Sequence, residues 1–110
     1  MSRNSLGEFE KLVTLAVLHL GHEAYGAAII QELEEKTGRT ASAGAVYVAL
    51  RRLEKKGHVT SRLGEPSPQR GGRPKRYFTV GPEGIEALRR AQEDWAAMAR
   101  GLEETLEHSG

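Results

Sequence analysis

The stretch that most constrains the fold of this chain is residues 40–57, which has the pattern of one helix with two different faces. At about 100° per residue, one side collects apolar residues at the spacing of a helix that packs on a core; they are Val46, Ala49, Leu50 and Leu53. The other side runs from a small residue through an aromatic and a β-branched residue to two cations, namely Gly44, Tyr47, Val48, Arg51 and Lys55. Such a helix is suited to enter a DNA major groove by its N-terminus.

The distribution of charge favours this interpretation over the alternative, a surface helix whose cations are simply solvated. The 110-residue chain has a formal net charge of only +1. Residues 38–79 nevertheless carry ten Lys or Arg and two Glu, a net charge of +8, whereas residues 1–37 and 80–110 have net charges of −3 and −4. A basic middle third between acidic ends can attract a polyanion such as DNA.

Length and composition indicate one folded domain without catalytic chemistry. The sequence has no cysteine, a single aspartate (Asp94) and no phosphate-binding loop, so we expect neither an enzyme nor a cofactor. His19 and His22 could touch one metal ion, but two ligands make a weak site and we expect none. The sequence has no signal-peptide pattern and no apolar run of about 18 residues, which predicts a cytoplasmic protein.

The residues before this segment predict two further helices. Ser5 and Glu8 have the spacing of a capping box. The apolar stripe that follows ends at Gly21 and is widened by Leu15 and Leu18, so we expect this first helix to be central and largely buried. The members of the stripe are Phe9, Leu12, Val13, Ala16, Val17 and Leu20.

A second helix is predicted over residues 25–36, beginning at Tyr25 or the next residue and capped by Gly38. The side chains expected to face inward are Tyr25, Ile29 and Leu33. A tight turn then leads to Thr40 or Ser42 as the N-cap of the helix described first. Two short helices joined by such a turn indicate a helix-turn-helix arrangement.

After Gly57 the pattern changes to that of a β-hairpin, with strands predicted over residues 58–63 and 75–80. The connection, residues 64–74, contains three prolines and three glycines, which exclude regular structure across it. Four cations lie in or next to this connection, namely Arg70, Arg73, Lys75 and Arg76. We expect them to contact phosphates or a DNA groove; the alternative is a solvated loop without a partner.

The last helix should begin at Pro82 and run to about Glu107. Its apolar residues fit a heptad seam with one polar position, Gln92; the seam consists of Ile85, Leu88, Ala91, Trp95, Met98, Ala99, Leu102 and Leu106. A helix of this length spans about 37 Å, more than the width of the preceding globule. We therefore expect a homodimer through this seam, the alternative being a helix that folds back over its own core.

With these elements in order, the chain resembles the PadR family of transcriptional regulators. The resemblance covers residues 6–106 and is carried by AYG at 24–26, SAGAVYVALRRLEKKGHV at 42–59 and GGRPKRYFTVGPEGIEAL at 71–88. The family usually has Leu-Tyr-Pro in its recognition helix, often preceded by Thr. Here Ala45 is followed by Val46, Tyr47 and Val48, so the tyrosine is kept.

The resemblance implies a mainly α fold with a small β-hairpin: a winged helix-turn-helix over residues 1–80 and a single dimerisation helix over 81–110, in one compact unit. It implies a repressor that occupies an inverted-repeat operator in double-stranded DNA and is released by a small molecule, often aromatic. Together with the residue pattern, it leads us to expect DNA contacts from Ser42, Gly44, Ala45, Tyr47, Val48, Arg51, Arg52 and Lys55 of the recognition helix, and from Arg70, Arg73, Lys75 and Arg76 of the wing.

Trp95 lies near the middle of the predicted seam, where two indoles of a dimer could face each other. We hypothesise that they form an aromatic effector site; plain interface packing is the alternative. A second alternative concerns the whole chain, because a winged helix can also serve as a protein–protein interaction module.

Overall fold

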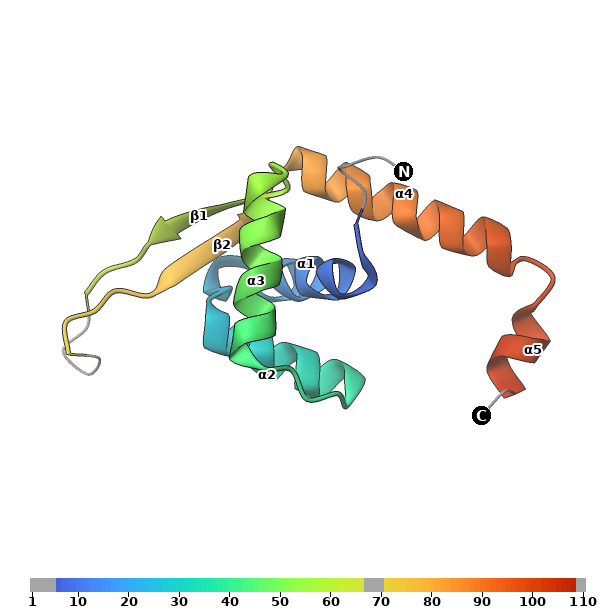
Figure 1. The fold of residues 1–110 in the computed structure, drawn as a ribbon, viewed down its shortest axis with the longest axis horizontal. Coiled ribbons are helices and arrows are strands. Elements are labelled where there is room, and N and C mark those ends of the chain that lie inside the picture. The colour runs from blue at the N-terminus through green and yellow to red at the C-terminus, as the bar shows by residue number, and fades with distance from the viewer. Residues whose placement is uncertain (1–5, 67–70, 109–110) are drawn as a thin grey trace.

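The protein is described by a computed structural model that covers residues 6–66 and 71–108. The elements are α1 (Glu8–Leu20), the 3-10 turn η1 (Gly21–Glu23), α2 (Gly26–Thr37), α3 (Ala43–Lys55), β1 (Val59–Leu63), β2 (Arg76–Val80), α4 (Pro82–Ala99) and α5 (Glu103–His108). Helices α1 to α3 form the body, the hairpin projects to one side, and α4 leads away to the other (Figure 1). The prediction of a mainly α fold with a small β-hairpin is confirmed.

The core lies where the apolar sides of α1, α2 and α3 meet the start of the hairpin. Its buried side chains are Val13, Ala16, Val17, Ala24, Ile29, Leu33, Val46, Ala49, Leu50, Leu53, Val59 and Phe78. Leu50 and Leu53 of α3 are 1% and 0% exposed, and burying a leucine contributes about 1.5–3 kcal/mol. All four residues predicted for the apolar side of this helix are buried, so that prediction is confirmed.

Helix α1 differs from the prediction at its start and on one side. Its N-cap is Gly7, whose amide donates to a carboxylate oxygen of Glu10 at 3.0 Å; Ser5, the predicted cap, lies outside the described residues. Leu15 and Leu18 are 39% and 44% exposed, so the expectation that they are buried was wrong. The physical reason is that the buried apolar residues of α1, Val13, Ala16 and Val17, lie on one side of the helix, and the two leucines lie outside that side.

The helix-turn-helix has the predicted cap at Gly38, and of the two candidates for the N-cap of α3, Thr40 and Ser42, it is Ser42 that takes this position. Gly38 adopts a left-handed conformation (φ 72°) at the end of α2, and the Ser42 hydroxyl accepts from the Ala45 amide at the start of α3. Tyr25 does not face the core as expected, because it packs edge-on against Tyr77 of β2 with ring centroids 5.6 Å apart. A short bridge joins these two residues, so α2 is tied to the hairpin rather than only to the core.

Strands β1 and β2 are antiparallel, with Val59 opposite Val80 and Ser61 opposite Phe78. The face that carries Val59 and Phe78 is buried against the helices, as alternation along a strand requires. The Phe78 amide also donates to the Ala24 carbonyl at 2.8 Å, which fixes the base of the hairpin to the segment before α2.

The predicted single C-terminal helix to Glu107 was wrong, because α4 ends at Ala99 and α5 begins at Glu103. Arg100 is extended and Gly101 has φ 88°, a left-handed conformation that breaks the helical path. The Glu103 carboxylate accepts from the Gly101 amide at 3.0 Å just before α5, which takes a new direction (Figure 1).

Glu10 joins the start of α1 to the end of α3. It is 8% exposed, and one carboxylate oxygen lies 2.6 Å from the Lys56 ammonium. Burial alone would raise the pKa of Glu10, but the hydrogen bonds from Lys56 and the Gly7 amide, with the charges of Lys56 and Arg52, hold it below the ordinary 4.5. The ionised carboxylate is therefore the form that the folded chain stabilises.

We expect Glu10→Gln to lower the free energy of unfolding by about 2 kcal/mol at neutral pH, because Lys56 loses its charged partner. Since the pKa of Glu10 is lower in the folded than in the unfolded chain, its contribution is present above pH 4.5 and is lost as the pH falls through the folded-state pKa. Urea unfolding across this range should show a decline that is smaller in Glu10→Gln than in the wild type.

Glu8→Gln is the matched control for this prediction, because Glu8 directly follows the same cap, Gly7, but its side chain is 81% exposed. It should leave both the stability at neutral pH and the acid decline close to those of the wild type. Identical pH profiles for Glu10→Gln and the wild type would contradict the role given to Glu10.

Candidate nucleic-acid interface

Helix α3 presents its predicted basic front to solvent. Tyr47 and Val48 are 46% and 44% exposed although the opposite side of the helix is buried. The other residues predicted for this front and its flank are exposed as well: Ser42, Gly44, Ala45, Arg51, Arg52 and Lys55. The first turn of this surface carries small side chains, so a groove wall could approach the backbone of α3 closely.

The Ser42 hydroxyl is engaged within the helix, because its oxygen accepts from the Ala45 amide at 3.1 Å. Ser42 therefore acts first as the N-cap that fixes where α3 begins. A cation further along the helix, Arg52, points to another side than Arg51. It lines a shallow hollow with the start of α1, beside Val48 and Ala49.

Tyr47 reaches across the helix-turn-helix to the start of α2. A Cβ atom built on Gly26 would overlap the Tyr47 hydroxyl and ring, so the ring needs a glycine at that position. This contact was missed in the sequence, although the AYG pattern marks the position. Tyr47, Gly26, Lys75 and Arg76 line one hollow of about 350 Å³, which also opens on Tyr25, Ala27 and Pro74.

Two cations of the hairpin region make cation–π contacts with tyrosine rings. The Lys75 ammonium lies 3.8 Å from the Tyr25 ring centroid, and the Arg62 guanidinium lies 4.8 Å from that of Tyr77. Such stacking holds long cationic side chains in place. Arg62 was not among the predicted DNA contacts. It is a cation on a strand of the predicted hairpin, and this position could have indicated it. Arg73 is exposed, whereas Arg70 lies outside the described residues.

The recognition helix and the hairpin face each other across a second hollow of about 320 Å³. It is lined by Tyr47, Leu50, Arg51, Glu54, Arg76 and Phe78. The structure therefore brings Arg51 of α3 and Arg76 of β2 to one groove, although they are 25 positions apart in the sequence. A phosphate that entered this groove would lie between two guanidinium groups.

The predicted seam of the C-terminal region is largely uncovered within the chain. Ile85, Trp95, Met98, Leu102 and Leu106 are 50%, 58%, 79%, 49% and 46% exposed, and Leu88, Ala91 and Ala99 are half-buried. The Lys11 ammonium lies 6.0 Å from the centroid of the Trp95 ring. Within one chain, this row of large apolar side chains forms an exposed patch on α4 and α5.

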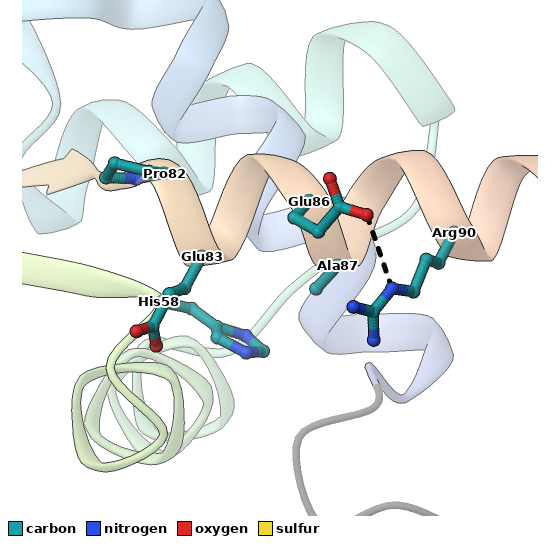
Figure 2. A pocket seen from close by; sticks show the side chains of 6 residues that line it. All are labelled: His58, Pro82, Glu83, Glu86, Ala87 and Arg90. Atoms are coloured by element: carbon teal, nitrogen blue, oxygen red, sulfur yellow. Dashed lines mark hydrogen bonds and ion pairs between the residues drawn. The ribbon is translucent and has the colours of Figure 1, made fainter.

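Helix α4 is seated on the body at His58, beside a hollow of about 380 Å³ (Figure 2). The Gly81 amide donates to the His58 carbonyl at 2.9 Å, and a Cβ on Gly84 would overlap that carbonyl oxygen. The close approach therefore requires Gly84, a residue for which the sequence pattern gave no signal. Glu86 accepts from Arg90 at 3.3 Å on the same helix (Figure 2).

The His58 ring is 2% exposed, and its Nδ1 atom meets no hydrogen-bond partner in the described chain. Burial, and then the nearby charge of Lys56, lower the pKa of His58 below its ordinary 6.5, so the ring is neutral at pH 7. His58 therefore serves as a neutral filler between α3, β1 and α4 rather than as a charged DNA contact.

Within residues 6–66 and 71–108, no cluster of three or more His, Asp or Glu side chains could hold a metal ion. Over the same ranges, no helix is both long enough and apolar enough to cross a membrane.

Comparisons with known proteins agree on one family. Residues 14–90 match the model of the transcriptional regulator PadR-like family. A PadR family transcriptional regulator from Eggerthella lenta is similar in structure, with a TM-score of 0.65 and 29% identity over 90% of this chain and 87% of that one. No curated protein sequence gave a significant match.

Two further solved structures share the fold. A transcriptional regulator from Clostridium thermocellum has a TM-score of 0.71 and 24% identity, over 86% of this chain and 89% of that one. A PadR-like transcriptional regulator from Bacillus cereus has a TM-score of 0.71 and 20% identity, over 93% and 92% of the two chains. Both matches cover more than four fifths of this chain, so the similarity is to the fold as a whole.

Proposed function

The chain belongs to the PadR-like family of transcriptional regulators, and from this premise we propose that it is a homodimeric repressor that binds an inverted-repeat operator and is released by a small-molecule effector. The observation that carries the proposal is the groove shared by α3 and the hairpin, where Arg51 and Arg76 meet. In a winged helix, cations from two elements that line one groove can contact the phosphates on either side of a DNA groove.

In the proposed complex, the N-terminal half of α3 enters the major groove. Gly44 and Ala45 allow close approach, and Val48 offers an apolar contact to a base edge. Arg51 and Lys55 continue along the same front, with Arg52 at the adjoining backbone. The wing places Arg73, Lys75 and Arg76 at phosphates or in the minor groove, and Tyr47 contacts a phosphate next to the start of α2.

Dimerisation is proposed to use residues 81–110, with residues 1–80 as the DNA-binding part. Trp95, Met98, Leu102 and Leu106 leave a row of apolar side chains uncovered on α4 and α5. The molecule measures 54 × 30 × 21 Å, and its C-terminal helices extend beyond the body (Figure 1). A second copy of the chain is the partner that closed two-fold symmetry favours, and Leu15 of α1 adds to the area it would cover.

The effector is proposed to contact Trp95. The indole is more than half exposed within one chain and lies next to the Lys11 ammonium. An exposed aromatic plane beside a cation suits a planar aromatic compound that carries a negative or polar group. In a dimer, the two indoles would bound such a site from both subunits.

We expect tight, salt-sensitive binding to duplexes selected from a random-sequence pool. If six to eight phosphates are neutralised per dimer, the logarithm of the binding constant should fall with the logarithm of salt concentration with a slope of about −6. Arg73→Ala should reduce this slope by about two, one for each subunit. Arg51→Ala should weaken binding about tenfold or more.

The matched control is Arg90→Ala, which removes an equal charge from α4, where Arg90 pairs with Glu86 and lines neither hollow of the α3 front and the hairpin. It should change the binding constant and the salt slope little. Failure of the wild type to bind any duplex at about 50 mM salt would refute the proposed function.

We expect the purified protein to sediment as a dimer at micromolar concentration and Met98→Glu to weaken the dimer at least about tenfold, because a buried, unpaired carboxylate is costly. Ala97→Glu is the matched control, since Ala97 is an exposed neighbour on α4 outside the predicted seam. A wild type that stays monomeric, or equal effects of the two substitutions, would count against this interface.

Trp95 is the only tryptophan in the sequence, so its fluorescence reports directly on the proposed effector site. We expect one or more planar aromatic compounds to quench it saturably and to weaken operator binding. Calorimetry should show the affinity lost in Trp95→Ala and partly kept in Trp95→Phe. No saturable change across a broad panel of aromatics would reject the site.

A further inference from the structure

Glu54 brings a negative charge onto the surface that should face DNA. It is the penultimate residue of α3 and is exposed, within a segment that carries ten cations and two glutamates. A carboxylate there repels the phosphate backbone and, on charge alone, should weaken DNA binding. Its position therefore calls for another physical role.

The hydrogen bonds of Glu54 indicate that role. A Glu54 carboxylate oxygen accepts from the Ser61 hydroxyl of β1 at 2.7 Å. The Ser61 oxygen in turn accepts from the Arg76 guanidinium of β2 at 3.0 Å. Arg76 donates to Ser61, and Ser61 donates to Glu54. These two consecutive hydrogen bonds link the recognition helix to both strands of the wing.

The strand register explains why these three side chains meet. Ser61 is opposite Phe78, and Leu63 is opposite Arg76, so Ser61 and Arg76 are diagonal neighbours on one face of the hairpin. Phe78 on that face is 5% exposed and packs on the core. The same face is therefore turned to α3, and Glu54 and Arg76 both line the groove between α3 and the hairpin.

We propose that Glu54 is a positioning residue for DNA binding: through Ser61, it holds the Arg76 guanidinium in the groove between α3 and the hairpin, where its remaining donors meet a phosphate beside Arg51. This inference rests on the DNA-binding function proposed above. Glu54 would thus strengthen DNA binding, although its negative charge alone would weaken it.

Two physical effects support the proposal. An arginine has five N–H donors, and the bond to Ser61 uses one, which leaves the others for a phosphate. Ordering a free arginine side chain on binding costs conformational entropy, and a tether that exists before binding reduces that cost. The carboxylate also offsets the mutual repulsion of Arg51 and Arg76, which line the same groove.

The test compares Glu54→Ala with Glu54→Gln on a duplex selected from the random-sequence pool. Glu54→Gln removes the charge but keeps an oxygen that accepts from Ser61, whereas Glu54→Ala removes both. We expect Glu54→Ala to bind about fivefold more weakly than the wild type, and Glu54→Gln to bind equally or more tightly. Ser61→Ala should behave like Glu54→Ala, and Ser61→Thr should restore binding because it keeps the hydroxyl.

A double-mutant cycle with Arg76→Ala separates positioning from a general structural effect. Glu54→Ala should weaken binding in the wild-type background but not in the Arg76→Ala background, where no guanidinium is left to position. The salt slope should fall by a similar amount in Glu54→Ala and Arg76→Ala, because both remove the same phosphate contact. Thermal unfolding should be nearly unchanged, since Glu54 and Arg76 are exposed.

Two results would overturn the inference while leaving the proposed function intact. One is tighter binding by Glu54→Ala than by the wild type, which would make Glu54 a simple repulsive charge. The other is an equal loss from Glu54→Ala with and without the Arg76 side chain. A wild type that binds no duplex at low salt would overturn the proposed function and this inference with it.

Discussion

The structure depends on the burial of one side of α3. Leu50 and Leu53 fill the core against α1 and α2. The opposite side of the same helix therefore faces solvent. Because a helix of this length is rigid, fixing its back also fixes the direction of Arg51 and Lys55 on its front. The orientation of the exposed cationic surface is thus a direct consequence of core packing.

The wing is held by a different set of contacts. The Phe78 amide binds the Ala24 carbonyl, and the Tyr77 ring packs on Tyr25, so the hairpin is joined to the chain at the start of α2. Cations from separate parts of the sequence, Arg51 and Arg76, consequently reach one groove. Their proximity has an electrostatic cost that nearby acceptors such as Glu54 can offset.

Local sequence patterns were sufficient for the elements that repeat a simple period. The core side of α3 and the two strands followed from spacing and turn residues alone, which also narrowed the N-cap of α3 to Thr40 or Ser42. The error at residues 100–101 has a plain cause: the apolar heptads continue across Gly101, so the period favours a helix, whereas the backbone at Gly101 and the carboxylate of Glu103 favour a break. The spacing of apolar residues does not indicate where a local backbone conformation interrupts a helix.

Contacts between distant segments could not be predicted for a related reason. The demands on Gly26 and Gly84 come from Tyr47 and from the His58 carbonyl, which no spacing rule connects with them. The exposure of Leu15 and Leu18 likewise depends on which sides of α1 its neighbours happen to cover.

The seat of α4 on His58 has a mechanical consequence. The 18 residues of α4 span about 27 Å, and they are anchored near one end by the bond from Gly81 and the close approach of Gly84. A tilt of about 10° at this pivot moves the far end of the helix by about 5 Å, which exceeds the ~3.4 Å rise between neighbouring base pairs. In the proposed dimer, joined through α4 and α5, a small change of packing at the seam would therefore move each recognition helix relative to the base pairs that it contacts.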